Sequence, residues 1–193
     1  GLELPQAQVN QIRHHGILAH GLAVQAIRAH GKPGTQVGLA DNTVFYVPAF
    51  DTPEHVAAAK KATRENNAMF LTAIMEGRYI DEYLKQEGDA APKVEPGDMA
   101  IISSPLDFVG LNIYAPEWVR ADDGPTGYKY IPHLPSSPRM ASPWLVVGPE
   151  VAYWGVRLTS ELWNPKAIYI TENGASADDP VVDGHIDDAD RTI

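Results

Sequence analysis

The most constraining feature of this 193-residue sequence is the stretch from Ala167 to Gly174, Ala-Ile-Tyr-Ile-Thr-Glu-Asn-Gly. Its apolar and aromatic residues predict a short strand buried on both faces, as in a parallel sheet. The strand ends in a carboxylate, Glu172, and Asn173-Gly174 predicts an immediate sharp turn, because both residue types tolerate positive φ angles. An isolated Glu-Asn-Gly is more often a solvated turn, whereas an α/β barrel places its chemistry at such strand ends. The meaning of Glu172 therefore depends on the rest of the chain.

Helices and strands alternate along the sequence. The spacing of apolar residues predicts helix 9–29, strand 36–40, a helix from Pro53 to about Met75, strand 107–114, helix 150–163 and strand 167–171. This alternation indicates an α/β fold with a parallel sheet. Three strands cannot close a barrel and leave two sheet edges unpaired. The chain therefore forms either a small open sheet or part of something larger.

The first predicted helix carries Ile12, Leu18, Leu22 and Ile27 at roughly helical spacing, so these residues are expected to form its buried stripe. Four histidines lie on or beside this helix: His14, His15, His20 and His30. Metal ligation by them is weakly supported, because no Glu lies between a His pair as in a zinc-hydrolase helix. Packing or surface roles are the simpler interpretation.

Two segments are predicted to be loops. Residues 88–105 contain several prolines and glycines, and residues 115–149 lack any periodicity. A loop as long as the second inside a compact domain is usually a binding loop. Its aromatic residues are Trp118, Tyr128, Tyr130 and Trp144. Such rings stack on sugar faces, but half of them could equally pack the loop onto the fold.

Composition excludes several classes of function. The chain has no cysteine, so disulfides and thiol chemistry are excluded. A net charge of −10 argues against a nucleic-acid partner, and no run of about 18 apolar residues predicts a membrane span. The acidic tail from Asp178 to Asp190 lacks the glycine and terminal Glu of an EF-hand and is expected to be a solvated loop. Because nothing near Gly1 resembles a signal peptide, a cytoplasmic location is the expectation.

Four segments together resemble glycoside hydrolase family one, the β-glucosidase family of (β/α)8 barrels. Residues 170–174, Ile-Thr-Glu-Asn-Gly, are similar to the family's nucleophile signature at the end of strand seven. Residues 107–114 resemble strand six, residues 37–42 with Pro48-Ala49 resemble strand five and its loop, and residues 14–24 resemble the helix after strand four. The four segments occur in the family's order, and the resemblance covers nearly the whole chain.

The resemblance implies a retaining β-glycosidase, most simply a β-glucosidase acting on a β-glucoside or oligosaccharide, with no cofactor and no metal. Such an enzyme needs two carboxylates about 5 Å apart, one nucleophile and one acid/base. By resemblance Glu172 is the nucleophile, and Tyr114 donates a hydrogen bond that orients it and keeps it ionised. Asn112, on the same strand face as Tyr114, would line the sugar subsite. Asn42 would face the leaving-group side.

One departure from the family pattern is large. The family's acid/base lies in an Asn-Glu-Pro motif at the end of strand four, and no Asn-Glu-Pro occurs in this chain. The sequence corresponds to helix four through just beyond strand seven, so residues 1–193 are expected to be a single partial barrel domain. A complete barrel typically needs about 250 residues. We therefore expect the isolated chain to be inactive, and stable only when paired with the remainder of the barrel or with copies of itself.

Two other interpretations remain open at this point. The chain could be a non-catalytic sugar-binding or interaction module that kept parts of a barrel. It could also belong to a related enzyme of the same family that acts on phosphorylated or other β-glycosides. The residues that would bind a phosphate group of such a substrate lie outside the segments found here.

Overall fold

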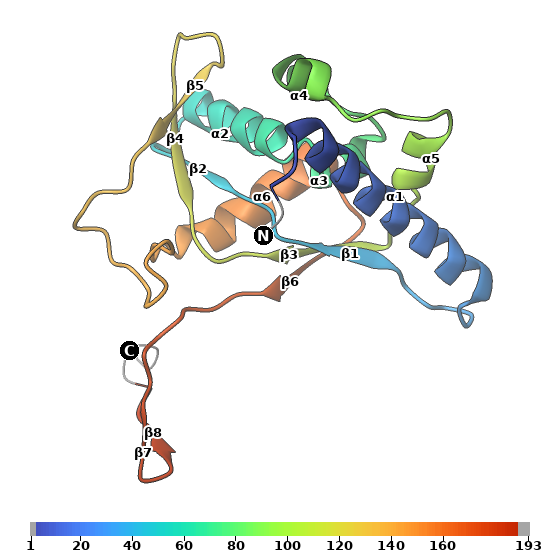
Figure 1. Cartoon of the computed structure of the whole chain (residues 1–193). Helices are drawn as coiled ribbons and strands as arrows, with labels where there is room; N and C mark the ends of the chain where they lie inside the picture. The colour runs from blue at the N-terminus through green and yellow to red at the C-terminus, as the bar shows by residue number, and fades with distance from the viewer. Residues whose placement is uncertain (1–2, 189–193) are drawn as a thin grey trace.

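The computed structural model describes residues 3–188 of the chain. The elements, in chain order, are α1 (Gln6–His30), β1 (Gly38–Asp41), β2 (Tyr46–Pro48), α2 (Pro53–Asn66), α3 (Leu71–Glu76), α4 (Asp81–Glu87), the 3-10 helix η1 (Gly88–Ala90), α5 (Asp98–Ile102), β3 (Phe108–Asn112), β4 (Glu117–Ala121), β5 (Tyr128–Ile131), α6 (Glu150–Trp163), β6 (Ile168–Glu172), β7 (Val181–Val182) and β8 (His185–Ile186). Figure 1 shows their arrangement.

The central element is a three-stranded parallel sheet in the order β1-β3-β6. Its strands are the three that the sequence predicts, so the α/β prediction is confirmed. Because the strands are parallel, their carboxyl ends meet at one edge, where Asp41, Asn112 and Glu172 are the last residues. The registered pairs include Leu39 with Val109, and Val109 with Ile168.

The two faces of this sheet differ. Val109, Leu111 and Ile113 are almost fully buried in the main core together with Leu158 and Trp154 of α6. We call this side the covered face. Helix α6 approaches it closely at Gly155, where an added Cβ would lie 2.9 Å from Ile113 Cδ1.

The residues that alternate with these on β3, namely Phe108, Gly110 and Asn112, point to the opposite side, which we call the open face. In Figure 1 the helices lie on one side of the sheet, and on the other side the only element of the described residues is the β7–β8 hairpin, which stands away from the sheet. There the Phe108 ring packs edge-on against Tyr169, with ring centroids 5.3 Å apart.

Residues 115–149 are not the structureless loop that the sequence predicts. They contain β4 and β5, which form an antiparallel hairpin, and β4 also pairs in parallel with β2. The strands were hidden from sequence analysis because they are three to five residues long and lie among prolines and glycines. Tyr128 is buried and Trp118 packs against the core, so these two rings serve packing.

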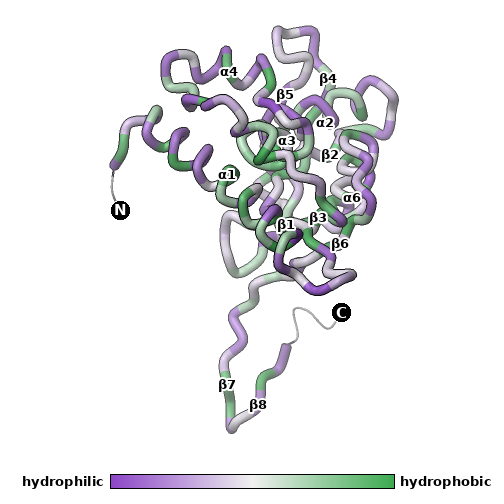
Figure 2. The backbone as a smooth tube through the Cα atoms, turned by 90° about the vertical axis from the view of Figure 1, so that its right-hand side faces the viewer, coloured by the Kyte–Doolittle hydropathy of each residue, from purple (hydrophilic) through white to green (hydrophobic). Residues whose placement is uncertain are grey.

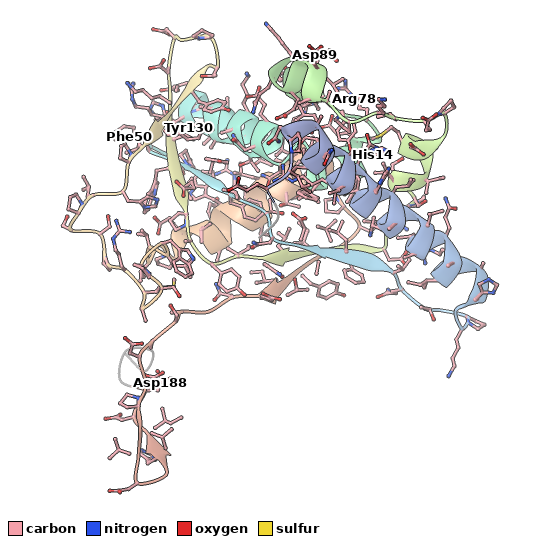
Figure 3. The ribbon with its side chains drawn as sticks, in the orientation of Figure 1. His14, Phe50, Arg78, Asp89, Tyr130 and Asp188 are labelled. Atoms are coloured by element: carbon pink, nitrogen blue, oxygen red, sulfur yellow. The ribbon has the colours of Figure 1, made fainter. Side chains whose placement is uncertain are left out.

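Helix α1 covers the predicted range, but of its predicted buried stripe only Leu18 is partly buried against the core. The buried residues are Asn10, His14, Ile17, Gly21 and Val24. The exposed ones include Ile12, which is 57% exposed, as well as Leu22 and Ile27. Polar partners explain this burial. His14, which Figure 3 labels on α1, reaches the Tyr79 hydroxyl at 2.9 Å and an Asp98 oxygen at 3.1 Å.

The predicted helix from Pro53 to Met75 is in fact two helices. Helix α2 ends at Asn66 and α3 begins at Leu71. The buried side chain of Asn67 occupies the break and donates hydrogen bonds to the carbonyls of Val44 at 2.9 Å and Thr63 at 2.7 Å. The other predicted loop, residues 88–105, likewise contains a short helix, α5.

A charged cluster closes the amino-terminal end of the central sheet. Asp107, just before β3, accepts a hydrogen bond from the Val37 backbone N–H at 2.9 Å and pairs with Arg28 at 2.6 Å and Lys166 at 3.3 Å. The Val37 hydrogen bond and the two cations lower the pKa of Asp107 to about 2. Asp107 therefore ties together α1 and the starts of all three strands.

After β6 the chain leaves the body and forms the small β7–β8 hairpin, which stands apart in Figures 1 and 2. Figure 2 shows apolar positions in this hairpin, and Val181, Val182 and Ile186 are half or more exposed. Asp187 and Asp188 follow it, whereas Asp190 lies outside the described residues. Between residues 3 and 188, no helix has the length and apolarity of a membrane span, and no three acidic or histidine side chains are grouped for a metal ion.

Candidate active site

Three of the four predicted site residues come together at the carboxyl edge of the central sheet. Glu172 is the last residue of β6, Asn112 is the last residue of β3, and Tyr114 follows two residues later. The Tyr114 hydroxyl donates a hydrogen bond to Glu172 Oε2. The contact expected between these two side chains is therefore present.

Neighbouring hydrogen bonds fix the backbone around Glu172. The Ile113 N–H donates to the Glu172 carbonyl at 2.8 Å, and the Asn173 side-chain amide donates to the Ile113 carbonyl at 2.8 Å. One residue before Glu172, the Thr171 hydroxyl donates to Asn112 Oδ1 at 2.7 Å. Sequence analysis gave Thr171 no separate role and Asn173 only a place in a turn, because neither residue type by itself signals a contact with β3.

The electrostatics of the pair favour a neutral phenol at Tyr114. The hydrogen bond to Glu172 is the main cause that raises the pKa of Tyr114 above its ordinary value, and desolvation and the carboxylate's negative charge raise it further. Tyr114 therefore keeps its proton throughout the neutral range and remains a hydrogen-bond donor. The hydrogen bond from Tyr114 engages Oε2 of Glu172.

The prediction that this strand is buried on both faces is wrong. Tyr169 and Ile170 are 51% and 47% exposed, and Thr171 and Glu172 are exposed as well. The reason is that β6 is the outer strand of the three and pairs only with β3. On the side away from β3, β6 has no neighbouring strand within the part of the chain that the structure describes.

The predicted sharp turn at Asn173-Gly174 is also wrong. Residues 173–180 contain no turn, and Asn173 does not adopt a positive φ angle. The Asn173 side chain is instead used to bind the β3 backbone, which keeps the chain extended as it leaves the sheet.

Asn42, the fourth predicted site residue, is exposed immediately after β1, at the same edge of the sheet. Among the described residues it makes no hydrogen bond with Glu172, Tyr114 or Asn112. Its neighbour Asp41 accepts a hydrogen bond from the Thr43 hydroxyl. Burial raises the pKa of Asp41, an effect partly opposed by Thr43.

Glu172 itself is exposed at the end of β6. A hollow of about 690 Å³ lies elsewhere, between α2, α4 and the β4–β5 hairpin, and it contains none of the four predicted site residues. Tyr130 lines that hollow. At the exposed edge of β6 and on the open face, one side of Glu172 is not covered by the described residues.

One exposed aromatic ring belongs to a segment tied to the chain beyond Glu172. Residues 139–146 form a small loop closed by the pairing of Arg139 with Val146. The Ala141 N–H donates to the Ser176 carbonyl at 3.0 Å, and the Ser142 N–H donates to Ser176 Oγ at 2.8 Å. Trp144, in this loop, is 75% exposed.

Comparison with known proteins identifies the family. The model of glycosyl hydrolase family 1 matches residues 1–193. β-Glucosidase A of Thermotoga maritima is 34% identical over 181 residues, which cover 92% of this chain and 40% of that protein. A β-glucosidase of an Agrobacterium species is 36% identical over 182 residues, covering 92% of this chain and 39% of the relative. The chain thus spans about two fifths of the length of these relatives.

Solved structures agree. The virulence factor SghA of Agrobacterium tumefaciens superposes with a TM-score of 0.78 and 31% identity, over 97% of this chain and 42% of SghA. The family 1 β-glucosidase of Thermotoga maritima superposes with a TM-score of 0.71 and 33% identity, over 93% of this chain and 40% of that enzyme. The α/β sheet is accordingly an incomplete (β/α)8 barrel, as the sequence predicts. The match over its full length and these relatives show that the chain belongs to glycosyl hydrolase family 1.

Proposed function

We propose that this chain supplies the nucleophile-bearing part of a retaining β-glycosidase, most simply a β-glucosidase that releases terminal β-D-glucosyl residues. The observation that carries the proposal is the hydrogen bond from Tyr114 to Glu172 at the carboxyl edge of a parallel sheet. The substrate class is supported by relatives named β-glucosidase and by a neighbouring structure of SghA with its substrate analog salicin.

In the proposed reaction, Glu172 attacks the anomeric carbon as the bond from that carbon to the leaving oxygen breaks. A second carboxylic acid gives its proton to the leaving oxygen. Water then attacks the glycosyl-enzyme, the second carboxylate accepts a proton from the water, and Glu172 departs as a carboxylate. Two inversions at the anomeric carbon retain its configuration.

Tyr114 and Asn112 have separate parts in this scheme. Tyr114 engages Oε2 of Glu172, so Oε1 is the attacking oxygen. Asn112 uses its Oδ1 to accept from Thr171, which leaves its two Nδ2 protons for a sugar hydroxyl or the catalytic acid. Asn42 would contribute to the leaving-group side from the end of β1.

The second carboxylate and the opposite wall of the sugar site are proposed to come from the remainder of the barrel. The chain contains no Asn-Glu-Pro motif to supply the acid/base. The exposure of Glu172 and the unpaired edge of β6 support a site that is completed by other strands. Residues 1–193 alone are therefore expected to show no turnover of an aryl β-glucoside.

The test is a chimaera in which residues 1–193 replace the stretch they match in Thermotoga maritima β-glucosidase A. We expect it to hydrolyse an aryl β-glucoside with retention of configuration by NMR, and Glu172→Gln to abolish turnover while far-UV circular dichroism stays unchanged. Turnover by residues 1–193 alone, or by the folded Glu172→Gln chimaera at the parent rate, would contradict the proposal. Sugar binding by a folded chimaera that has no turnover would favour a sugar-binding module instead.

A further inference from the structure

The pairing of β3 with β6 contains an irregularity next to Glu172. Leu111 is registered with Ile170, but the next residue of β3, Asn112, is registered with Glu172. Thr171 is therefore an extra residue on β6 with no cross-strand partner, as in a β-bulge. Bulges of this kind are frequent beside active sites, where they redirect a side chain.

The bulge changes the face to which Glu172 points. Ile168 lies opposite Val109 and packs against the covered face, whereas Tyr169 meets Phe108 on the open face. Strict alternation from these residues would place Thr171 on the open face and Glu172 on the covered face, opposite the buried Ile113. With the bulge, both Thr171 and Glu172 lie on the open face.

Two consecutive side chains on one face make two separate contacts with β3. Thr171 donates to Asn112 Oδ1 at 2.7 Å, while Glu172 accepts from Tyr114. Between residues 3 and 188 the Asn112 Nδ2 has no hydrogen-bond partner. The Thr171 contact thus determines which end of the Asn112 amide is turned outward, since a hydroxyl donating to Oδ1 leaves Nδ2 free.

Gly110 provides the space for this arrangement. A Cβ on Gly110 would lie 2.7 Å from Thr171 Cγ2, 3.0 Å from Thr171 Oγ1 and 2.9 Å from the Leu39 carbonyl. A real Cβ atom essentially never lies closer than 3.0 Å to a heavy atom outside its own residue and its chain neighbours. The absence of a side chain on β3 at this point is what lets Thr171 lie across the sheet toward Asn112.

We propose that Thr171 is a positioning residue, which the β6 bulge places beside Glu172 so that its hydroxyl holds the Asn112 amide with Nδ2 turned toward the substrate. This inference rests on the proposed function, because Asn112 is taken to bind sugar or the catalytic acid. Thr171 itself touches neither substrate nor the reacting atoms.

The activity test uses Thr171→Val and Thr171→Ser in the chimaera described above. Valine keeps the branched shape without the hydroxyl, and serine keeps the hydroxyl. Loss of one hydrogen bond predicts that Thr171→Val lowers kcat/KM about 3- to 10-fold, and that Thr171→Ser stays within about twofold of the parent. In an Asn112→Ala background, Thr171→Val is expected to have no further effect, because its action passes through Asn112.

A second measurement is independent of turnover. In the chimaera labelled with ¹⁵N, the Asn112 side-chain amide should become more mobile in Thr171→Val but not in Thr171→Ser, by heteronuclear NOE. Equal Asn112 signals in all three proteins, or an undiminished Thr171→Val effect in the Asn112→Ala background, would overturn the inference. An inactive parent chimaera whose Asn112 amide still responds to Thr171→Val would count against the proposed function and in favour of this positioning role.

Discussion

Two glycines in α1 predict opposite effects for the same substitution. Gly16 is exposed, and an added Cβ would meet no atom within 4 Å. Gly21 is buried, and its added Cβ would lie 2.5 Å from the Ile101 carbonyl carbon, 2.9 Å from the Ile102 nitrogen and closer still to the Ile101 oxygen. All of these atoms belong to the backbone of α5, so no side-chain rotation can relieve the overlap.

The magnitudes follow from two terms. Alanine is favoured over glycine inside a helix by about 1 kcal/mol, so Gly16→Ala should raise the free energy of unfolding by about that amount. Gly21→Ala gains the same term, but overpacking costs about 1–3 kcal/mol, and a rigid backbone contact places the cost at the upper end. We therefore expect a net loss of about 2 kcal/mol for Gly21→Ala, and a difference of about 3 kcal/mol between the variants.

The assay is urea unfolding of residues 1–193, monitored by circular dichroism at 222 nm. Wild type and both variants are compared at one protein concentration. In thermal melts the expected shifts are about 2–4 °C upward for Gly16→Ala and about 4–8 °C downward for Gly21→Ala. The reasoning is refuted if Gly21→Ala proves as stable as Gly16→Ala, because α1 would then not pack on α5 through Gly21.

Three further predictions concern other parts of the chain. The pKa of Asp107 is about 2 in the folded chain and 3.8 ordinarily, so its stabilising effect is complete above pH 4 and is lost as the pH falls toward 2. In Asp107→Asn the midpoint of urea unfolding should therefore fall less between pH 4 and pH 2 than in wild type. An equal fall in both proteins would argue against this role of Asp107. Leu158 is buried against the covered face, so Leu158→Ala should lower the free energy of unfolding by about 2–5 kcal/mol. Ser160 is exposed on the same helix, so Ser160→Ala should change that free energy by less than about 0.5 kcal/mol. Similar values for both variants would contradict the packing described. In the chimaera, Tyr114→Phe should lower kcat/KM about 10- to 100-fold, since it removes a hydrogen bond to a charged group, and full activity would exclude the proposed role of Tyr114.

Sequence reasoning succeeded where a pattern is local. The apolar runs that end in Asn112 and Glu172 predicted two strands of a parallel sheet, and helix α6 was predicted over its full range. The contact of Tyr114 with Glu172 was expected because the family resemblance placed both side chains at one end of the barrel.

It failed where a feature depends on residues distant in the sequence. The exposure of Tyr169 and Ile170 follows from the outer position of β6, which an apolar run cannot reveal. The buried face of α1 is set by His14 and its distant partners, Tyr79 and Asp98. Likewise, the bulge at residue 171 exists only as a register between two strands, so neither strand shows it alone.

The central claim is that Glu172 is the nucleophile, and covalent labelling tests it most directly. The chimaera would be incubated with a 2-deoxy-2-fluoro-β-D-glucoside that carries an activated leaving group, then digested and mapped by mass spectrometry. The fluorosugar slows hydrolysis of the glycosyl-enzyme, so the account predicts one added fluoroglucosyl group on the peptide that contains Glu172, and none in Glu172→Gln. A label on any other residue, in an enzyme that turns over the parent glucoside, would contradict it.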